Sequence, residues 1–290
     1  MNMPYLYLIL SVFMVASTSV FGKIFNRQND GRLDTSTFYN FLLMISVFLG
    51  WGILYVTDLS FDAGVLFYSA LFAICYLTCN IGIINALKYG PTAITSLLIN
   101  LSLIVTTIWG FLFWDADVSL NVIAGLVLVV ASIVLCLYSK EKDQKGISLK
   151  WLIYVSLALF GNAGCSIVQR TQQVKYNGQH GNMLMLFATG ACAIAYVILY
   201  LRSDKRDTKV MMKTSWWVPV CAGICNVVLN VFVMLMAVTT LSPSLIYPVI
   251  GVGGLAVVTV FSLFVFKEKM RWWQWIGIVV GALAVGLLSI

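Results

Sequence analysis

Residues 215–266 read SWWVPVCAGICNVVLNVFVMLMAVTTLSPSLIYPVIGVGGLAVVTVFSLFVF, a stretch without a single charged side chain. It holds two apolar runs, at about 215–238 and 243–266, and each is as long as the roughly 20 residues that a helix needs to cross a bilayer. Ser242-Pro243 separates them. Because proline ends one helix and fits the first turn of the next, we expect a very tight connection. The stretch therefore predicts a hairpin of two transmembrane helices.

Runs of the same kind fill the rest of the chain. Its 290 residues are 61% hydrophobic and only 10% charged, a balance that excludes a large water-soluble catalytic domain. Helices rather than strands are expected, because each run is long and continuously apolar and a helix satisfies its own backbone groups. The ten predicted spans lie at about 4–25, 37–56, 63–87, 92–114, 118–138, 150–169, 181–201, 215–238, 243–266 and 272–290.

The two halves of the chain resemble each other at a fixed spacing. An offset of 147 residues pairs Tyr7 with Tyr154, and an offset of about 150 pairs Asn80 with Asn230. A competing offset of 146 pairs Asn80 with Asn226, but an offset of 150 needs no insertion inside a helix. Since five is an odd number of spans, a second set of five enters the membrane from the opposite side and forms an inverted repeat.

These observations predict one architecture for the whole chain. We expect an all-α polytopic membrane protein with ten transmembrane helices arranged as two inverted five-helix repeats. The predicted units are a single membrane domain at 1–290, a first repeat at about 1–139, a second repeat at about 150–290, and a cytoplasmic connector at about 139–150.

Basic residues are distributed unevenly between the two predicted sides of the membrane. The connections after the first, third, fifth, seventh and ninth spans hold 16 of the 18 Lys and Arg residues, and only Arg170 and Lys175 fall on the other side. By the positive-inside rule, these five connections are cytoplasmic and both termini lie outside. The expected location is the cytoplasmic membrane, as in the inner membrane of a bacterium.

Residues that other functions require are missing or scattered. The single His180 lies in a loop without a nucleophile and an acid around it, so we predict no catalytic residue, no metal site and no cofactor. The net charge of +7 comes from loops beside apolar runs, so no nucleic-acid partner is expected. All seven cysteines lie inside apolar runs, where they are expected to pack rather than to form disulfides.

Polar residues inside the apolar runs are the candidates for solute binding. Asn162, Ser166, Gln169 and Gln173 follow i, i+4, i+7 and i+11 spacing and so form one polar stripe on a helix. Lipid does not tolerate such a stripe, so it faces either a cavity that binds a neutral or zwitterionic solute, or a neighbouring helix to which it hydrogen-bonds. The other candidates are Tyr76 with Asn80 on one helix face, Asn226 with Asn230 on another, Asn100 and Tyr247.

Arg170 lies on the outer side, against the charge rule and next to the polar stripe. One interpretation is that it draws the carboxylate or phosphate of a solute into an outer vestibule. The other is that it ends its helix and reaches the headgroup layer, paired with an acid. The candidate acids on that side are Asp58, Asp62, Asp115 and Asp117.

All eleven acidic residues fall in loops or at helix ends, so no carboxylate is expected at the bilayer midplane. Their absence there argues against proton-coupled antiport of organic cations, because nothing central could exchange a proton for a cation. A cation site built from aromatic faces remains an alternative. The candidate aromatic residues are Trp51, Trp109, Tyr68 and Tyr76.

Several further motifs resemble those of a known family. They are Ala86-Leu-Lys-Tyr-Gly-Pro through Trp114 in the first half, and Ser242-Pro243 through Lys267-Glu268-Lys269, Gly277 and Gly281 in the second. On these residues the chain resembles the drug/metabolite transporter superfamily in its ten-helix EamA-like form. The resemblance implies a cavity lined mainly by the first, third, fourth, sixth, eighth and ninth spans, with the fifth and tenth peripheral.

The chain departs from the family pattern in two places. Asp115 and Asp117 stand where the family usually shows Gly-Glu, and the fourth span has no proline that matches Pro248. The two halves are therefore expected to be coupled asymmetrically.

We therefore expect a secondary transporter, not an enzyme, that moves a small polar metabolite by alternating access between the two halves. By the resemblance, an amino acid or a related neutral or zwitterionic solute is the first candidate. The alternatives are an organic cation or drug exporter with an aromatic-lined cavity, and a non-transporting membrane scaffold or receptor. The expected partners are the solute and the lipid bilayer, and the expected assembly is a monomer or a homodimer.

Overall fold

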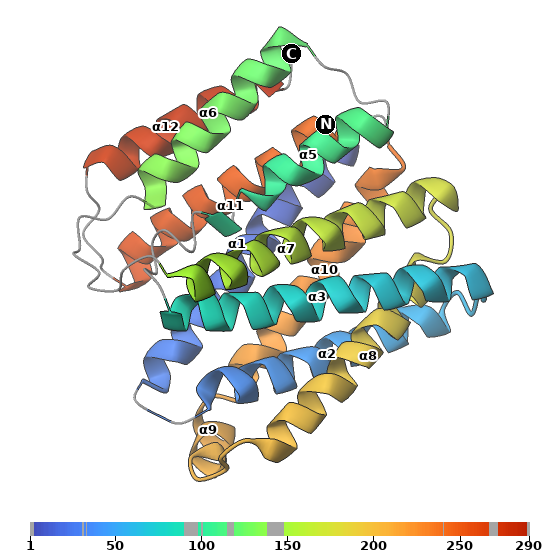
Figure 1. The fold of residues 1–290 in the computed structure, drawn as a ribbon, viewed down its shortest axis with the longest axis vertical. Helices are drawn as coiled ribbons and strands as arrows, with labels where there is room; N and C mark the ends of the chain where they lie inside the picture. The colour runs from blue at the N-terminus through green and yellow to red at the C-terminus, as the bar shows by residue number, and fades with distance from the viewer. Residues whose placement is uncertain are drawn as a thin grey trace.

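The computed structural model describes residues 3–30, 32, 34–89, 98–99, 101–114, 119–137, 148–239, 241–266 and 272–288. Within these ranges every regular element is a helix, which confirms the predicted all-α class (Figure 1). The helices are α1 (Met3–Gln28), α2 (Thr35–Val56), α3 (Ala63–Tyr89), α5 (Ser102–Phe113), α6 (Leu120–Leu137), α7 (Leu149–Lys175), α8 (Gly181–Arg202), α9 (Thr208–Thr214), α10 (Trp217–Ala237), α11 (Pro243–Phe266) and α12 (Trp272–Leu288). Gly90-Pro91, Asn100, Asp115, Asp117 and Lys267-Glu268-Lys269 lie outside the described residues.

Six helices are long and apolar enough to cross a membrane: α1, α2, α3, α7, α8 and α10. Four shorter apolar helical segments lie within the remaining predicted spans, at Ile104–Phe113, Leu120–Leu135, Ser244–Val258 and Trp275–Ala284. The described part of the chain therefore has the composition and helix lengths of a polytopic membrane protein. The count of ten crossing helices stays a prediction.

α7 is longer than the sequence predicted. It continues to Lys175 instead of ending near residue 169, so Arg170 lies inside the helix and not at its end. The helix stops where Asn177 and Gly178 take positive φ angles of 50° and 80°. There the Gly178 N–H donates to the Gln173 carbonyl at 2.8 Å, a closure typical of helix C-termini. The extension keeps the whole polar stripe on one helix.

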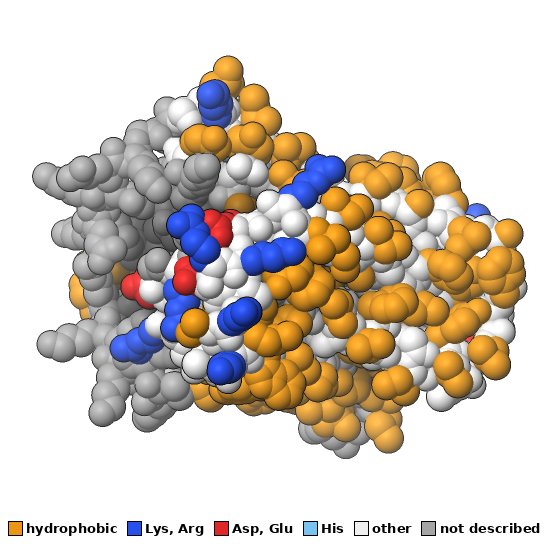
Figure 2. All heavy atoms as spheres, turned by 90° about the horizontal axis from the view of Figure 1, so that it is seen from below, with side chains coloured by type: hydrophobic (Ala, Val, Ile, Leu, Met, Phe, Trp, Pro, Cys, Tyr) orange, Lys and Arg blue, Asp and Glu red, His pale blue; other side chains and the backbone are white. Residues whose placement is uncertain are grey.

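The connection between α8 and α10 contains the short helix α9, where we expected only a polar connector. Met211 accounts for it, because its side chain is buried against Phe25, Phe38 and Val218 and so anchors the turn to the core. α9 lies at the lower end of the molecule in Figure 1. Exposed basic residues on and beside it are Arg202, Lys205, Arg206, Lys209 and Lys213. Figure 2 shows Lys and Arg side chains gathered on this lower face, next to a broad area of hydrophobic side chains.

Most of the extensive helix contacts join the two halves of the chain. α3 lies along α7 and α1 along α10, α2 packs on α8, and α6 packs on α12 (Figure 1). Suppose that α1 is exchanged with α7, α2 with α8, α3 with α10 and α6 with α12. The α3–α7 pair then becomes the α10–α1 pair, and the α2–α8 and α6–α12 pairs stay the same. The packing therefore has an approximate exchange symmetry. α6 and α12, the fifth and tenth predicted spans, lie together at one edge, as the resemblance implies.

Glycine allows α3 and α7 to approach closely. A methyl group added at Gly82 would lie 2.5 Å from a backbone nitrogen of α7, and one added at Gly161 would lie 2.7 Å from a backbone nitrogen of α3. The backbone of each helix thus occupies the space of a side chain on the other, as small residues permit in membrane helices. The exchange-related pair, α1 with α10, has no such glycine contact among the described residues, and it stacks Tyr7 on Phe232 with ring centroids 5.5 Å apart.

Candidate functional site

A cavity of about 250 Å³ lies between the two halves, midway along the helices. Its walls come from α1, α2, α3, α7, α8, α10 and α11. Its polar lining residues are Tyr76, Asn162, Ser166, Gln169, Thr189, Asn226, Asn230 and Tyr247, and its thiols are Cys79, Cys165 and Cys192. No charged residue lines it among the described residues.

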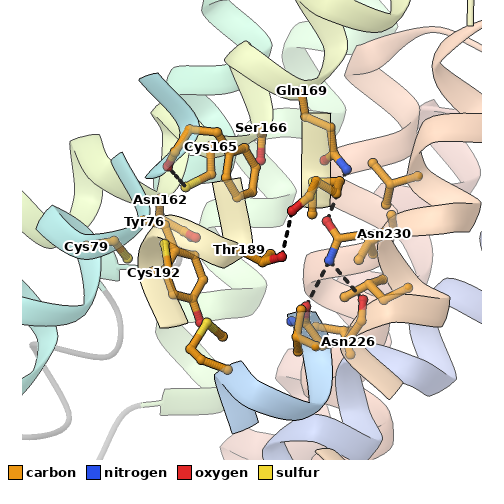
Figure 3. A pocket seen from close by; sticks show the side chains of 18 of the residues that line it. Tyr76, Cys79, Asn162, Cys165, Ser166, Gln169, Thr189, Cys192, Asn226 and Asn230 are labelled. Atoms are coloured by element: carbon orange, nitrogen blue, oxygen red, sulfur yellow. Dashed lines mark hydrogen bonds between the residues drawn. The ribbon is translucent and has the colours of Figure 1, made fainter. Parts of the chain in front are cut away.

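Asn230 of α10 is the centre of a hydrogen-bonded chain of amides on one wall of this cavity. Its side-chain oxygen accepts from Gln169 Nε2 of α7 at 3.1 Å. Its nitrogen donates to the backbone and side-chain oxygens of Asn226, at 2.8 and 3.1 Å (Figure 3). These hydrogen-bonded amides join α7 to α10 and at the same time line the cavity. The two interpretations of the polar stripe, cavity wall and helix contact, are therefore both realised at Gln169.

Asn162, two turns earlier on α7, makes a second contact of this kind. Its Nδ2 donates to the Ser102 hydroxyl of α5 at 2.8 Å. The neighbouring hydroxyl of Tyr247 donates to the Ser166 backbone carbonyl at 3.4 Å, which is long for such a bond. Polar groups on α7 thus tie this helix to α5, α10 and α11 around the cavity.

The opposite wall is soft and largely apolar. Figure 3 shows Cys79, Cys165, Cys192 and Tyr76 on one side of the cavity, together with Asn162, facing Gln169, Asn226 and Asn230 on the other. The Cys165 and Cys192 thiols lie 4.0 and 3.9 Å from backbone carbonyls of α3, so they are satisfied within the protein. The cavity consequently offers hydrogen bonds on one side and polarisable surface on the other.

The structure brings most of the predicted binding residues to this cavity. Those that line it are Tyr76, Asn162, Ser166, Gln169, Asn226, Asn230 and Tyr247. Asn80 does not line it, and its amide donates to the Tyr76 carbonyl of its own helix at 2.9 Å. Asn100 lies outside the described residues. Of the aromatic residues considered for a cation site, Trp51, Trp109 and Tyr68 do not line the cavity either.

Sequence reasoning missed the thiols and Thr189. Cys79 lies three residues after Tyr76, and Cys165 three residues after Asn162, so each shares a helix face with a residue that was predicted to bind. That spacing could have identified them. The walls also include α2 and α8, which the resemblance did not imply, and no described residue of α5. α2 and α8 reach the cavity because they pack on α10 and α3 respectively.

A second cavity, of about 220 Å³, lies one helical turn further along α7 and α10. Gln173, the last residue of the polar stripe, lines it together with Met234, Trp51, Asp58 and Asn182. The Trp51 side chain is fully buried and its indole nitrogen has no hydrogen-bond partner. A residue that lines this cavity therefore carries a buried donor without a partner among the described residues.

Arg170 follows Gln169, which lines the first cavity, and precedes Gln173, which lines the second. Its side chain is only 8% exposed. Its guanidinium packs over the Trp114 ring, 5.3 Å from the centroid, and interacts with the Tyr247 hydroxyl. Its Nε is buried without a hydrogen-bond partner, and none of the described carboxylates pairs with it. Of the two interpretations of Arg170, the one that places it at the end of its helix is therefore wrong, because α7 continues past it.

Two of the acids considered as its partners have other contacts. Asp58 accepts from the Ser60 hydroxyl at 2.9 Å, and Asp62 accepts from the Gly64 N–H at 2.7 Å. The other two, Asp115 and Asp117, lie outside the described residues.

Comparison with known proteins identifies the family of this chain. A solved crystal structure matches with a TM-score of 0.73 over 99% of this chain and 98% of the other, at 11% identity, which shows the fold alone. No curated protein sequence matches. The EamA-like transporter family matches residues 2–138 and 149–290, one segment in each half. Since the match covers nearly the entire chain, this integral membrane protein belongs to the EamA-like transporter family of the drug/metabolite transporter superfamily.

Proposed function

We propose that the protein is a secondary transporter that moves a small polar metabolite across the cytoplasmic membrane by alternating access. The observation that carries this proposal is the cavity between the halves, with amides of α7 and α10 on one wall and no charged lining residue among those described. Amides that donate and accept suit a neutral or zwitterionic solute. Amino acids and related metabolites are the first candidates, because of the family resemblance.

Alternating access is supported by how the halves pack. In the proposed architecture, ten helices form two inverted five-helix repeats, and the solute site lies between them near the midplane. Because the helix pairs are related by exchange of the halves, we propose that the protein switches between two similar packings in which the halves exchange roles. The second cavity would serve as the outer vestibule. The hydrogen bond between Gln169 of α7 and Asn230 of α10 lies one helical turn before this second cavity. We expect this bond to break when the path from the central cavity to the second cavity opens.

The proposed orientation places both termini outside and the connections after α1, α3, α6, α8 and α11 in the cytoplasm. It is supported by the exposed basic residues around α9, which lie on the predicted cytoplasmic side (Figure 2). We propose that the protein acts without a cofactor and is not an enzyme. An organic cation exporter is the weaker alternative, because no carboxylate lines the cavity among the described residues.

The test is thermal unfolding of the purified full chain in detergent against neutral, zwitterionic, cationic and anionic metabolites. A ligand that binds only the folded state raises the midpoint. We expect one class to do so, and Asn162→Leu and Gln169→Leu to lose the shift. Asn85→Leu is the matched control, since Asn85 also lies on a membrane-spanning helix but bonds its own backbone outside the cavity.

A shift that survives in both cavity variants would make the polar stripe a helix contact only. No shift with any class would favour a non-transporting scaffold or receptor. Any ligand found in this way is then supplied to proteoliposomes, where flux that depends on the protein demonstrates transport.

A further inference from the structure

Arg170 presents an unusual combination of burial and charge. A guanidinium keeps its positive charge at any physiological pH, and burying an unpaired charge costs several kcal/mol. Proteins normally compensate such a group with a carboxylate. Among the described residues, Arg170 has instead the Trp114 ring and the Tyr247 hydroxyl, and its Nε–H has no acceptor at all. Its hydrogen-bonding capacity is therefore only partly used.

The position of Arg170 connects it to the central cavity. Its neighbour Gln169 lines that cavity, and so does its contact Tyr247. The Tyr247 hydroxyl bonds the Ser166 carbonyl at the long distance of 3.4 Å, so an oxygen of a solute can replace that carbonyl at little cost. Tyr247 thus stands between the buried charge and the space where a solute would bind.

The electrostatics of the cavity follow from this arrangement. The cavity has no charged lining residue among those described, and the Arg170 guanidinium interacts with Tyr247, which lines it. In a site shielded from water, a single positive charge acts over several ångströms with little screening. It attracts anionic groups into this end of the cavity and repels cations.

We propose that Arg170 and Tyr247 form a subsite for an anionic oxygen group of the transported solute, a carboxylate or a phosphate, at the α7 C-terminal end of the central cavity. This inference rests on the proposed transport function and narrows its substrate class. The guanidinium supplies positive charge from behind Tyr247, with which it interacts. Tyr247 supplies a hydroxyl that reaches the cavity wall. The amides of Gln169 and Asn230 remain for the polar groups on the rest of the solute.

The first test compares solutes that differ only in the anionic group. Thermal midpoints of the full chain are measured with L-alanine, with L-alaninamide, which lacks the carboxylate, and with inorganic phosphate. A charge-assisted bond to a carboxylate corresponds to about 10- to 100-fold tighter binding. We expect that preference for alanine or phosphate over alaninamide in the wild type. The more strongly bound anion identifies which group the subsite accepts.

Three variants assign the preference to Arg170. Arg170→Met is expected to abolish it, and Arg170→Lys, which keeps the charge, to retain part of it. Lys175→Met is the matched control, because it removes the same charge from an exposed position on the same helix and should retain the full preference. A carboxylate or phosphate preference that persists in Arg170→Met would overturn the inference.

Two outcomes separate this inference from the proposed function. If neutral or cationic solutes raise the midpoint while alanine and phosphate do not, the anion subsite is wrong and transport of another solute class stands. If no solute of any class raises it, the proposed function fails and the subsite fails with it.

A second measurement needs no ligand. If Arg170 lacks a protein counter-charge, Arg170→Met leaves the ligand-free midpoint unchanged or raises it, because a buried unpaired charge has been removed. A marked fall, matched by an equal fall in Asp115→Asn or Asp117→Asn, would reveal a structural ion pair and would overturn the inference.

Discussion

The two halves of the molecule occupy related positions around the cavity but supply different chemistry. α1 contributes only Val15 to the lining, whereas α7, its counterpart in the second half, contributes Asn162, Ser166 and Gln169. The polar residues of α1 do something else: their hydroxyls donate to carbonyls of their own helix. These are Ser11, Ser17, Thr18 and Ser19. The exchange symmetry therefore constrains how helices pack without constraining which side chains they present.

The helix contacts show the same divergence. α3 meets α7 through glycines, so the two backbones touch, whereas none of the described glycines makes such a contact between α1 and α10. The two backbones are in contact at one interface, and at the other no described glycine brings them together. Related interfaces of a repeat therefore reach similar arrangements by different packing, and each should respond differently to substitution.

The largest effect is expected at the glycine contact. Gly161→Leu forces a side chain against the α3 backbone, which cannot move aside, and should destabilise the protein at or above the roughly 3 kcal/mol upper end for overpacking. Met14→Leu is the matched control. The offset of 147 residues makes Met14 of α1 the sequence equivalent of Gly161, and the Met14 side chain is only partly buried. Fluorescence-detected thermal unfolding measures both. Equal midpoints for the two variants would contradict the difference between the interfaces.

An intermediate effect is expected at the repeat-related asparagines. Asn230→Leu removes the centre of the amide chain and leaves the Gln169 amide without its acceptor, at a cost of about 1–2 kcal/mol. It should also abolish the ligand-induced shift in midpoint. Asn80→Leu breaks only a bond within α3, so it should cost less and leave ligand binding intact. Loss of binding in Asn80→Leu would show that the first half contributes an amide to the site after all.

The smallest effect concerns a feature that both halves keep. Tyr7 stacks on Phe232, and its repeat partner Tyr154 stacks on Tyr89 with centroids 5.8 Å apart. Tyr7→Leu and Tyr154→Leu should each lower the stability by about 0.5–1.5 kcal/mol, the contribution of an aromatic pair. Unfolding midpoints check this. A loss confined to one variant would extend the asymmetry of the halves to their aromatic contacts.

The positions of the helices could be predicted closely because the requirement behind them is local. A membrane span needs a continuous apolar run in which every backbone group bonds within the helix. The predicted run at 243–266 coincides with α11, and that at 181–201 with α8. The structure differs from the prediction at the end of α7 and at α9, where this requirement does not apply. The last turns of α7 are polar and stop only at Asn177 and Gly178, and α9 forms because Met211 meets core residues distant in sequence.

The candidate site was predictable in part for a related reason. Helical spacing places Asn162, Ser166 and Gln169 on one face, and lipid excludes that face, so it had to point inward. The same argument applied to Asn80 as to Asn230, yet only Asn230 lines the cavity. Spacing along a helix cannot distinguish the two, because it does not reveal what lies opposite each face.

The sequence by itself therefore determined the helical class, the places where helices run, and the stripe of polar residues on α7. Only the tertiary structure decided which wall carries amides and which thiols, that α2 and α8 join the lining, and that Arg170 is buried beside Tyr247. The physical reason is that the period of a helix sets the relative direction of its own side chains. The rotation of that helix against its neighbours is set by packing, as at the glycine contact of α3 with α7.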